Sequence, residues 1–145
     1  MRRSGVRSGL AAMAAILPPV PVAAQPVPEV PAHEPRAIWV NPSGSVKVEI
    51  GDCADKLCGW VTWASAEAEQ DARDGGTPKL VGTELLQDYH QTSPDNWTGR
   101  VFVPDWGRSF YSTIHRLNPG ALKIRGCILG GWVCRSQIWH RLSAP

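Results

Sequence analysis

The chain has little of what a membrane protein or a nucleic-acid-binding protein needs. None of its 145 residues belong to an apolar run long enough to span a bilayer, for which about 20 residues are required. Charge is sparse and nearly balanced, with 15 Lys and Arg against 13 Asp and Glu. Because a phosphate backbone is bound by a concentrated basic surface, we expect neither a membrane span nor a nucleic-acid partner.

Patterns typical of metal sites and catalytic sites are also scarce. No two of the four histidines lie at the spacing of metal ligands, so each is expected at the surface. No serine lies in a strand-to-helix nucleophile elbow, and the acidic stretch EAEQDARDGG lacks the alternating oxygen ligands of a calcium loop. We therefore expect no metal, no cofactor and no enzymatic activity.

The N-terminal part differs in composition from the rest. Residues 1–24 combine a basic start, the apolar stretch LAAMAAIL and small residues before Gln25, which is the pattern of a cleaved signal peptide. Residues 25–36 (QPVPEVPAHEPR) are rich in proline and predict a disordered tether. Three of the 15 basic residues lie in the leader, so cleavage would leave 12 basic against 13 acidic residues. These features predict a periplasmic or secreted protein.

Beyond the tether, short segments alternate between apolar and polar side chains. In residues 45–50 (SVKVEI) every second side chain is apolar, which is the period of a half-buried strand. Further segments of this kind, divided by turn sequences such as PDWGRS, NPG and LGG, lie at 57–63, 97–103, 110–117, 121–128 and 132–142. Helical patterning is weak, because residues 64–73 have no apolar stripe and residues 80–89 fit either a helix or a strand.

Six or more strands of this kind predict an all-β domain over residues 37–145. Its architecture is either a sandwich or a small antiparallel up-and-down β-barrel, with one long loop excursion over residues 64–96. The barrel is favoured, because closure leaves no strand edge unpaired.

The four cysteines predict two disulfides, for which three pairings are possible. Cys53 and Cys58 flank one predicted hairpin turn, and Cys127 and Cys134 flank another. Local pairing is therefore favoured over the crossed pairings. A zinc site is disfavoured, because six residues separate the second pair where two to four are usual. A redox dithiol is disfavoured as well.

Seven tryptophans are many for a chain of this length, and they fall on or beside predicted strands. They could fill the interior of a barrel or line a ligand cavity. In the last predicted strand, alternation puts Arg135, Gln137, Trp139 and Arg141 on one face, which could hold a polar ligand or could be a solvated outer face. The candidate ligand-binding residues are Trp63, Trp97, Arg135, Gln137 and Trp139.

Four segments of the predicted domain together form a specific pattern: AIWVNPSGSVKVEI (37–50), CADKLCGWVTW (53–63), WTGRVFVPDWGRSFYSTI (97–114) and LKIRGCILGGWVCRSQIWHRL (122–142). In these segments the chain resembles the bacterial exported family called domain of unknown function 2147. The resemblance implies a calycin-type barrel similar to lipocalins, in which a first-strand tryptophan packs on a last-strand arginine. Trp39 and Arg141 are the matching residues here. The resemblance implies no reaction.

A monomeric barrel of this kind has two main possible functions. It could bind a small apolar or amphipathic molecule in its interior. Alternatively, a filled barrel could be an envelope structural or protein-interaction module without a ligand. An enzyme would need convergent titratable groups at the barrel mouth. An enclosed cavity of several hundred cubic ångströms would favour the binding protein.

Overall fold

The computed structural model describes residues 5, 15–19, 21–22 and 35–142. The predicted signal peptide and tether therefore lie mostly outside the described residues. The chain divides into two units, Met1–Val30 and Pro31–Pro145, and all described helices and strands belong to the second. Within the described ranges, no helix has the length and apolar character that crossing a membrane would require.

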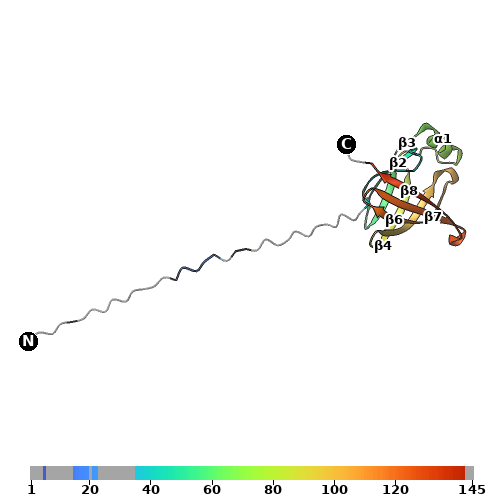
Figure 1. Ribbon diagram of the computed structural model, residues 1–145. Helices are drawn as coiled ribbons and strands as arrows, with labels where there is room; N and C mark the ends of the chain where they lie inside the picture. Colours follow the sequence, from blue (N-terminus) through green and yellow to red (C-terminus); the bar gives the residue numbers. More distant parts are fainter. Residues whose placement is uncertain (1–4, 6–14, 20, 23–34, 143–145) are drawn as a thin grey trace, which may run out of the picture. The chain divides into compact units, whose positions relative to one another are not determined.

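Eight antiparallel strands form a closed barrel in which each strand pairs with the next along the chain (Figure 1). They are β1 (Ala37–Val40), β2 (Val46–Cys53), β3 (Lys56–Ala64), β4 (Glu84–Ser93), β5 (Asn96–Val103), β6 (Arg108–Asn118), β7 (Ala121–Ile128) and β8 (Val133–Arg141). The helix α1 (Ala66–Asp74) joins β3 to β4, and the single-turn 3-10 helices η1 (Pro104–Trp106) and η2 (Leu129–Gly131) join β5 to β6 and β7 to β8. The predicted up-and-down β-barrel is confirmed.

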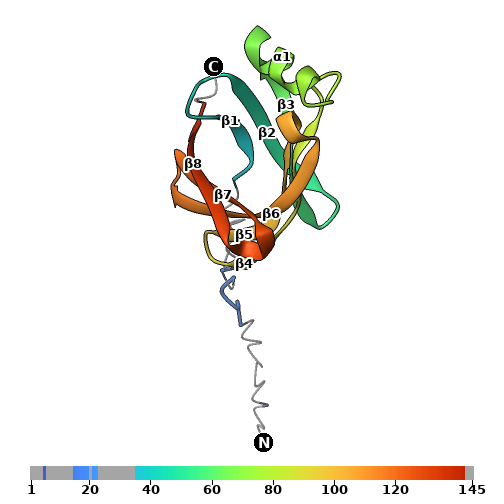
Figure 2. The same cartoon turned by 90° about the vertical axis from the view of Figure 1, so that its right-hand side faces the viewer.

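The barrel closes where the first strand meets the last (Figure 2). The register places Trp39 opposite Arg141 and Val40 opposite His140. The two ends of the domain are thus neighbouring strands. This seam is short, because β1 has only four residues whereas β8 has nine.

Trp39 anchors the seam from the inside of the barrel. Its side chain is 1% exposed, and its indole Nε1 donates a hydrogen bond of 2.6 Å to the carbonyl oxygen of Pro35. The stacking of Arg141 on this ring, implied by the family resemblance, is not found among the described residues. Arg141 is exposed, and the observed cation–π contact instead places the Lys47 ammonium 4.9 Å from the centre of the Trp63 ring. At the seam, the indole is held by burial and by this backbone hydrogen bond.

Strand alternation produces the hydrophobic core. In β2, Val46, Val48 and Ile50 are buried while the residues between them are more exposed, as the period-two pattern predicts. They pack with Trp39 and with other buried side chains contributed by β3 to β8 and by the segment before β4. Those side chains include Leu57, Val61, Leu80, Leu86, Tyr89, Trp97, Ile114 and Leu122.

The region from residue 64 to 96, predicted as one long loop excursion, contains a helix and a full strand. Residues 66–74 form α1, whose first turn is capped by the Ser65 hydroxyl accepting a 3.1 Å hydrogen bond from the Ala68 N–H. Residues 84–93 form β4, a full strand of the barrel, so the excursion contains only residues 65–83. Asp88 has a positive φ of 54°, and one extra β4 residue is inserted there relative to β5. This bulge interrupts the alternation and explains why β4 was ambiguous in the sequence.

A carboxylate fastens α1 to the segment that leads into β4. Glu69 accepts backbone hydrogen bonds of 3.1 Å from the N–H groups of Leu80 and Val81. These two hydrogen bonds favour the ionised form and lower the pKa of Glu69. At the other end of the helix, Gly75 lies so close to Asp105 that a Cβ atom would be 2.4 Å from its backbone. The helix is therefore held against η1 at one end of the barrel.

Replacing Trp39 by alanine is expected to lower the free energy of unfolding by about 3–5 kcal/mol, because a large buried side chain and its packing are lost. Urea unfolding followed by circular dichroism measures this change. Trp132→Ala is the control, because Trp132 is 90% exposed and its loss should change stability by less than about 0.5 kcal/mol. Equal stability of the two variants would show that Trp39 does not anchor the seam.

Candidate ligand-binding pocket

A cavity of about 450 Å³ lies on the inner face of β5 to β8. Because connections alternate between the two ends of an up-and-down barrel, η1 and η2 lie at the same end, and the cavity opens there. Apolar side chains make up most of its wall. The lining residues are Val101, Val103, Asp105, Trp106, Phe110, Ile124, Gly126, Ile128, Val133, Arg135, Gln137 and Trp139.

One position of the cavity wall, Gly126, carries no side chain, and it belongs to a row of three small residues that crosses β5, β6 and β7. Ser112 of β6 is registered opposite Gly99 of β5 and opposite Gly126 of β7. A Cβ atom on Gly126 would lie 3.2 Å from the Val101 side chain, and one on Gly99 would lie 2.7 Å from the Tyr89 ring. Larger residues at these positions would collide with neighbours or fill the cavity.

The polar groups of the pocket wall come mainly from β8. The Gln137 Oε1 atom accepts a 2.9 Å hydrogen bond from Trp139 Nε1, which holds the amide in place and leaves its N–H groups available. Arg135 lies two residues away on the same face and forms neither a hydrogen bond nor an ion pair with any described residue. Two hydrogen-bond donors thus face an otherwise apolar space, with Asp105 as the acidic group at η1.

The structure brings together three of the five predicted ligand-binding residues. Arg135, Gln137 and Trp139 all line the cavity, so this face of β8 is the inner face and not a solvated outer wall. Trp63 does not belong to the cavity, because it is 43% exposed and lies under Lys47. Trp97 is buried in the core, away from the cavity lining.

Several lining residues were not among the predicted ones. Val101 and Phe110 lie on strands whose inward face could be assigned only after the barrel was closed. Trp106 belongs to PDWGRS, which we interpreted only as a turn. In the structure Gly107 adopts a left-handed φ of 60°, which turns the chain back into β6. The Trp106 and Phe110 rings then meet edge to face at 5.6 Å between centroids.

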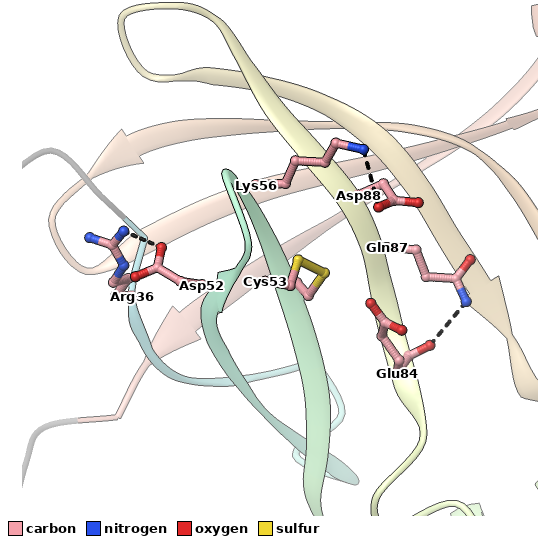
Figure 3. The surroundings of a disulfide bond; sticks show 8 residues. Arg36, Asp52, Cys53, Lys56, Glu84, Gln87 and Asp88 are labelled. Carbon is pink, nitrogen blue, oxygen red and sulfur yellow. Dashed lines mark hydrogen bonds and ion pairs between the residues drawn. A yellow bond between two sulfur atoms is a disulfide. The ribbon is translucent and has the colours of Figure 1, made fainter.

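A smaller polar pocket of about 130 Å³ lies beside the β2–β3 hairpin. Both of its basic side chains take part in ion pairs (Figure 3): Arg36 pairs with Asp52, and the Lys56 ammonium lies 3.4 Å from the carboxylate of Asp88. All four side chains are at least 40% exposed, so these pairs contribute little to stability. The larger cavity is the better candidate site.

Both disulfides are local, as favoured from the sequence. Cys53 is bonded to Cys58 and Cys127 to Cys134. Glu84 lies close enough to the first pair for the three side chains to surround an ion (Figure 3). The two sulfurs are bonded to each other, however, so neither is a thiolate ligand. Paired cysteines of this kind are typical of proteins in oxidising compartments.

Two buried hydroxyl groups, those of Tyr89 and Ser112, lie in the barrel interior. The side-chain oxygens of Tyr89 and Ser112 are both shielded from solvent, and neither has a hydrogen-bond partner within normal geometry among the described residues. Burial raises the pKa of the Tyr89 phenol, and the nearby Ser112 hydroxyl offsets only part of that rise. Tyr89 is therefore held in its neutral form.

The fold and the cavity define a small lipocalin-like β-barrel. The structure of HP1028 from Helicobacter pylori, described as belonging to the lipocalin family, superposes with a TM-score of 0.59 over 76% of this chain and 84% of that chain. The two sequences are 16% identical, so the likeness shows the fold alone. The chain belongs to the family described as "Uncharacterized protein conserved in bacteria (DUF2147)", which matches residues 37–141. No curated protein matches the chain.

Tyr89 should make the fold sensitive to alkaline pH. A tyrosine in the unfolded chain ionises near pH 10, whereas Tyr89 in the folded chain resists ionisation. The stability linked to this group is complete below about pH 10 and is lost as the pH rises above it. Tyr89→Phe should therefore flatten the fall in unfolding free energy between about pH 9 and pH 11.

Urea unfolding at several pH values measures this effect. Tyr111→Phe is the matched control, because Tyr111 is exposed and lies on the outer wall. Parallel pH profiles for the parent and Tyr89→Phe would contradict the assignment. All described cysteines are in disulfides, so free thiols do not complicate the alkaline measurements.

Proposed function

We propose that the protein binds a small apolar or amphipathic molecule in the cavity formed by β5 to β8. The observation that carries this proposal is a cavity of about 450 Å³ with a mostly apolar wall. Ligand sites of proteins have volumes of about 300–1,000 Å³ and combine apolar walls with a few placed polar groups. A filled barrel acting only as an interaction module would have no need for such a space.

The polar part of the wall favours an amphipathic ligand over a purely apolar one. Arg135 and the amide N–H groups of Gln137 are donors that no described residue uses. A carboxylate or another acceptor group on a ligand would be recognised by these donors, because charge-assisted hydrogen bonds to a guanidinium are strong. The rings of Trp139 and Phe110 would contact its apolar part.

The chemistry of the lining supports binding rather than catalysis. Among the residues that line the cavity, Arg135 and Asp105 are the ionisable ones, and no serine, cysteine or histidine accompanies them as a nucleophile or general base. We further propose a periplasmic or secreted location. The two disulfides and the predicted signal peptide over residues 1–24 support it.

A fluorescent amphipathic probe tests the proposal. The parent should bind one equivalent of the anionic dye 8-anilinonaphthalene-1-sulfonate, and Gly126→Leu should weaken binding at least about tenfold, because the new side chain occupies the cavity. Arg135→Gln should lower the affinity for the anionic dye more than the affinity for the uncharged dye N-phenyl-1-naphthylamine. Fluorescence titration measures both effects.

Lys123→Gln is the matched control for the arginine variant. It removes a positive charge from the exposed outer side of β7, where no cavity residue lies. Circular dichroism of each variant checks that the barrel is intact. Equal affinity of the parent and Gly126→Leu for both dyes would overturn the proposal and favour the filled interaction module.

A further inference from the structure

The last strand has a free edge. Pairing of β8 with β1 ends where Val40 lies opposite His140. Pairing of β8 with β7 continues without a register shift to Val133 opposite Ile128. The segment 134–138 (CRSQI) therefore has a strand neighbour on one side only, within the part of the chain that the structure describes.

The hydrogen bonds at the seam show which backbone groups face this edge. The Arg141 N–H donates to the Gly120 carbonyl at 3.0 Å, on the β7 side, while the Leu142 N–H donates to the Ile38 carbonyl at 2.9 Å, on the β1 side. Backbone groups of successive residues in a strand point to opposite sides. The N–H and C=O groups of the even-numbered residues from 134 to 138 therefore point away from β7, beyond the end of β1.

This segment is open to solvent on both faces. Arg135, Ser136 and Gln137 are all exposed, although successive side chains of a strand point to opposite faces. Natural edge strands are usually protected by proline, lysine, a bulge or an inward-pointing charge. Of these devices the segment has only the charge of Arg135. The unpaired backbone groups of such an edge can form hydrogen bonds with an additional strand.

We propose that a second copy of the chain pairs with this edge, antiparallel to it, with the two-fold axis at Ser136. The dimer would replace the monomer expected from the sequence. In this register Ser136 lies opposite Ser136 of the second copy, Arg135 opposite Gln137, and Cys134 opposite Ile138. The sheet of β7 and β8 then continues into β8 and β7 of the second copy.

Backbone direction and charge together select this register. An axis at Ser136 pairs all three residues whose backbone groups face the edge, 134, 136 and 138. An axis at Arg135 would pair only 134 with 136 within the free segment. It would also place two guanidinium groups opposite each other, which is destabilising. An axis at residue 134 or 138 would require residues outside the free segment.

A second copy is favoured over a strand from another protein because the segment is complementary to itself. In the register centred on Ser136 no like charges meet. The Arg135 guanidinium faces the amide of Gln137 of the second copy, whose Oε1 has a second lone pair besides the one that accepts from Trp139. This interaction satisfies the one charge that would otherwise protect the edge.

Substitution of Ser136 by proline tests the pairing directly. Proline removes the N–H that faces the free edge and leaves the β7 ladder intact, because that ladder uses odd-numbered residues. Sedimentation equilibrium of the exported chain with intact disulfides should show a dimer for the parent and for Ser136→Ala. Ser136→Pro should raise the dimer dissociation constant at least about tenfold, since two intermolecular hydrogen bonds are lost.

A second pair of variants remains informative if the proline variant does not fold. Ser136→Lys places like charges opposite each other across the axis, about 5.5 Å apart at Cα, so it should dissociate the dimer at low salt and allow it at high salt. Thr113→Lys adds the same charge two strands away in the register and should leave the dimer intact. The proposal would be overturned by a parent that stays monomeric up to about 1 mM. It would also be overturned if Ser136→Pro and Ser136→Lys associated as strongly as Ser136→Ala.

Discussion

The structure depends on the short pairing between β1 and β8. Two registered residue pairs join these strands, and without them the eight strands would be an open sheet with two bare borders. Trp39 makes so short a seam sufficient, because its buried indole fills the interior beside the seam and its Nε1 binds the Pro35 carbonyl. The first residues of the domain are thereby fixed by the same side chain that packs against the core.

The two ends of the barrel differ in how completely side chains fill the interior, and the filled end is the one at the seam. Near it, large side chains such as Trp39, Trp97 and Leu122 fill the interior completely enough to be almost inaccessible to solvent. Toward η1 and η2, Gly126 leaves part of the inner wall without a side chain, and β1 no longer accompanies β8. The interior there is hollow and open. Packing at one end thus holds a barrel whose other end can remain empty.

Much of the fold could be predicted from the sequence, because alternation, turns and cysteine spacing are local signals. Residues 45–50, the hairpin disulfides and the meeting of Trp39 with Arg141 all followed from such signals or from the family resemblance. The bulge at Asp88 disguised β4, since Leu85, Leu86 and Tyr89 no longer alternate. The site was harder to predict. Alternation grouped Arg135 with Trp139, but whether that face was inside depended on closure, a property of the whole sheet.

Closure was favoured from the sequence because it removes strand edges, and that argument holds only in part. A four-residue β1 cannot accompany a nine-residue β8, so a closed barrel keeps one free edge beside its cavity. Arg135 belongs to both features. Its side chain lines the cavity, and its backbone lies in the edge strand.

A ligand acceptor bound to this guanidinium would compete with Gln137 of a second copy for the same donors. By thermodynamic linkage, any difference in ligand affinity between monomer and dimer must equally shift the association of the two copies. The shortness of one strand would thus couple the occupancy of the cavity to the assembly of the protein.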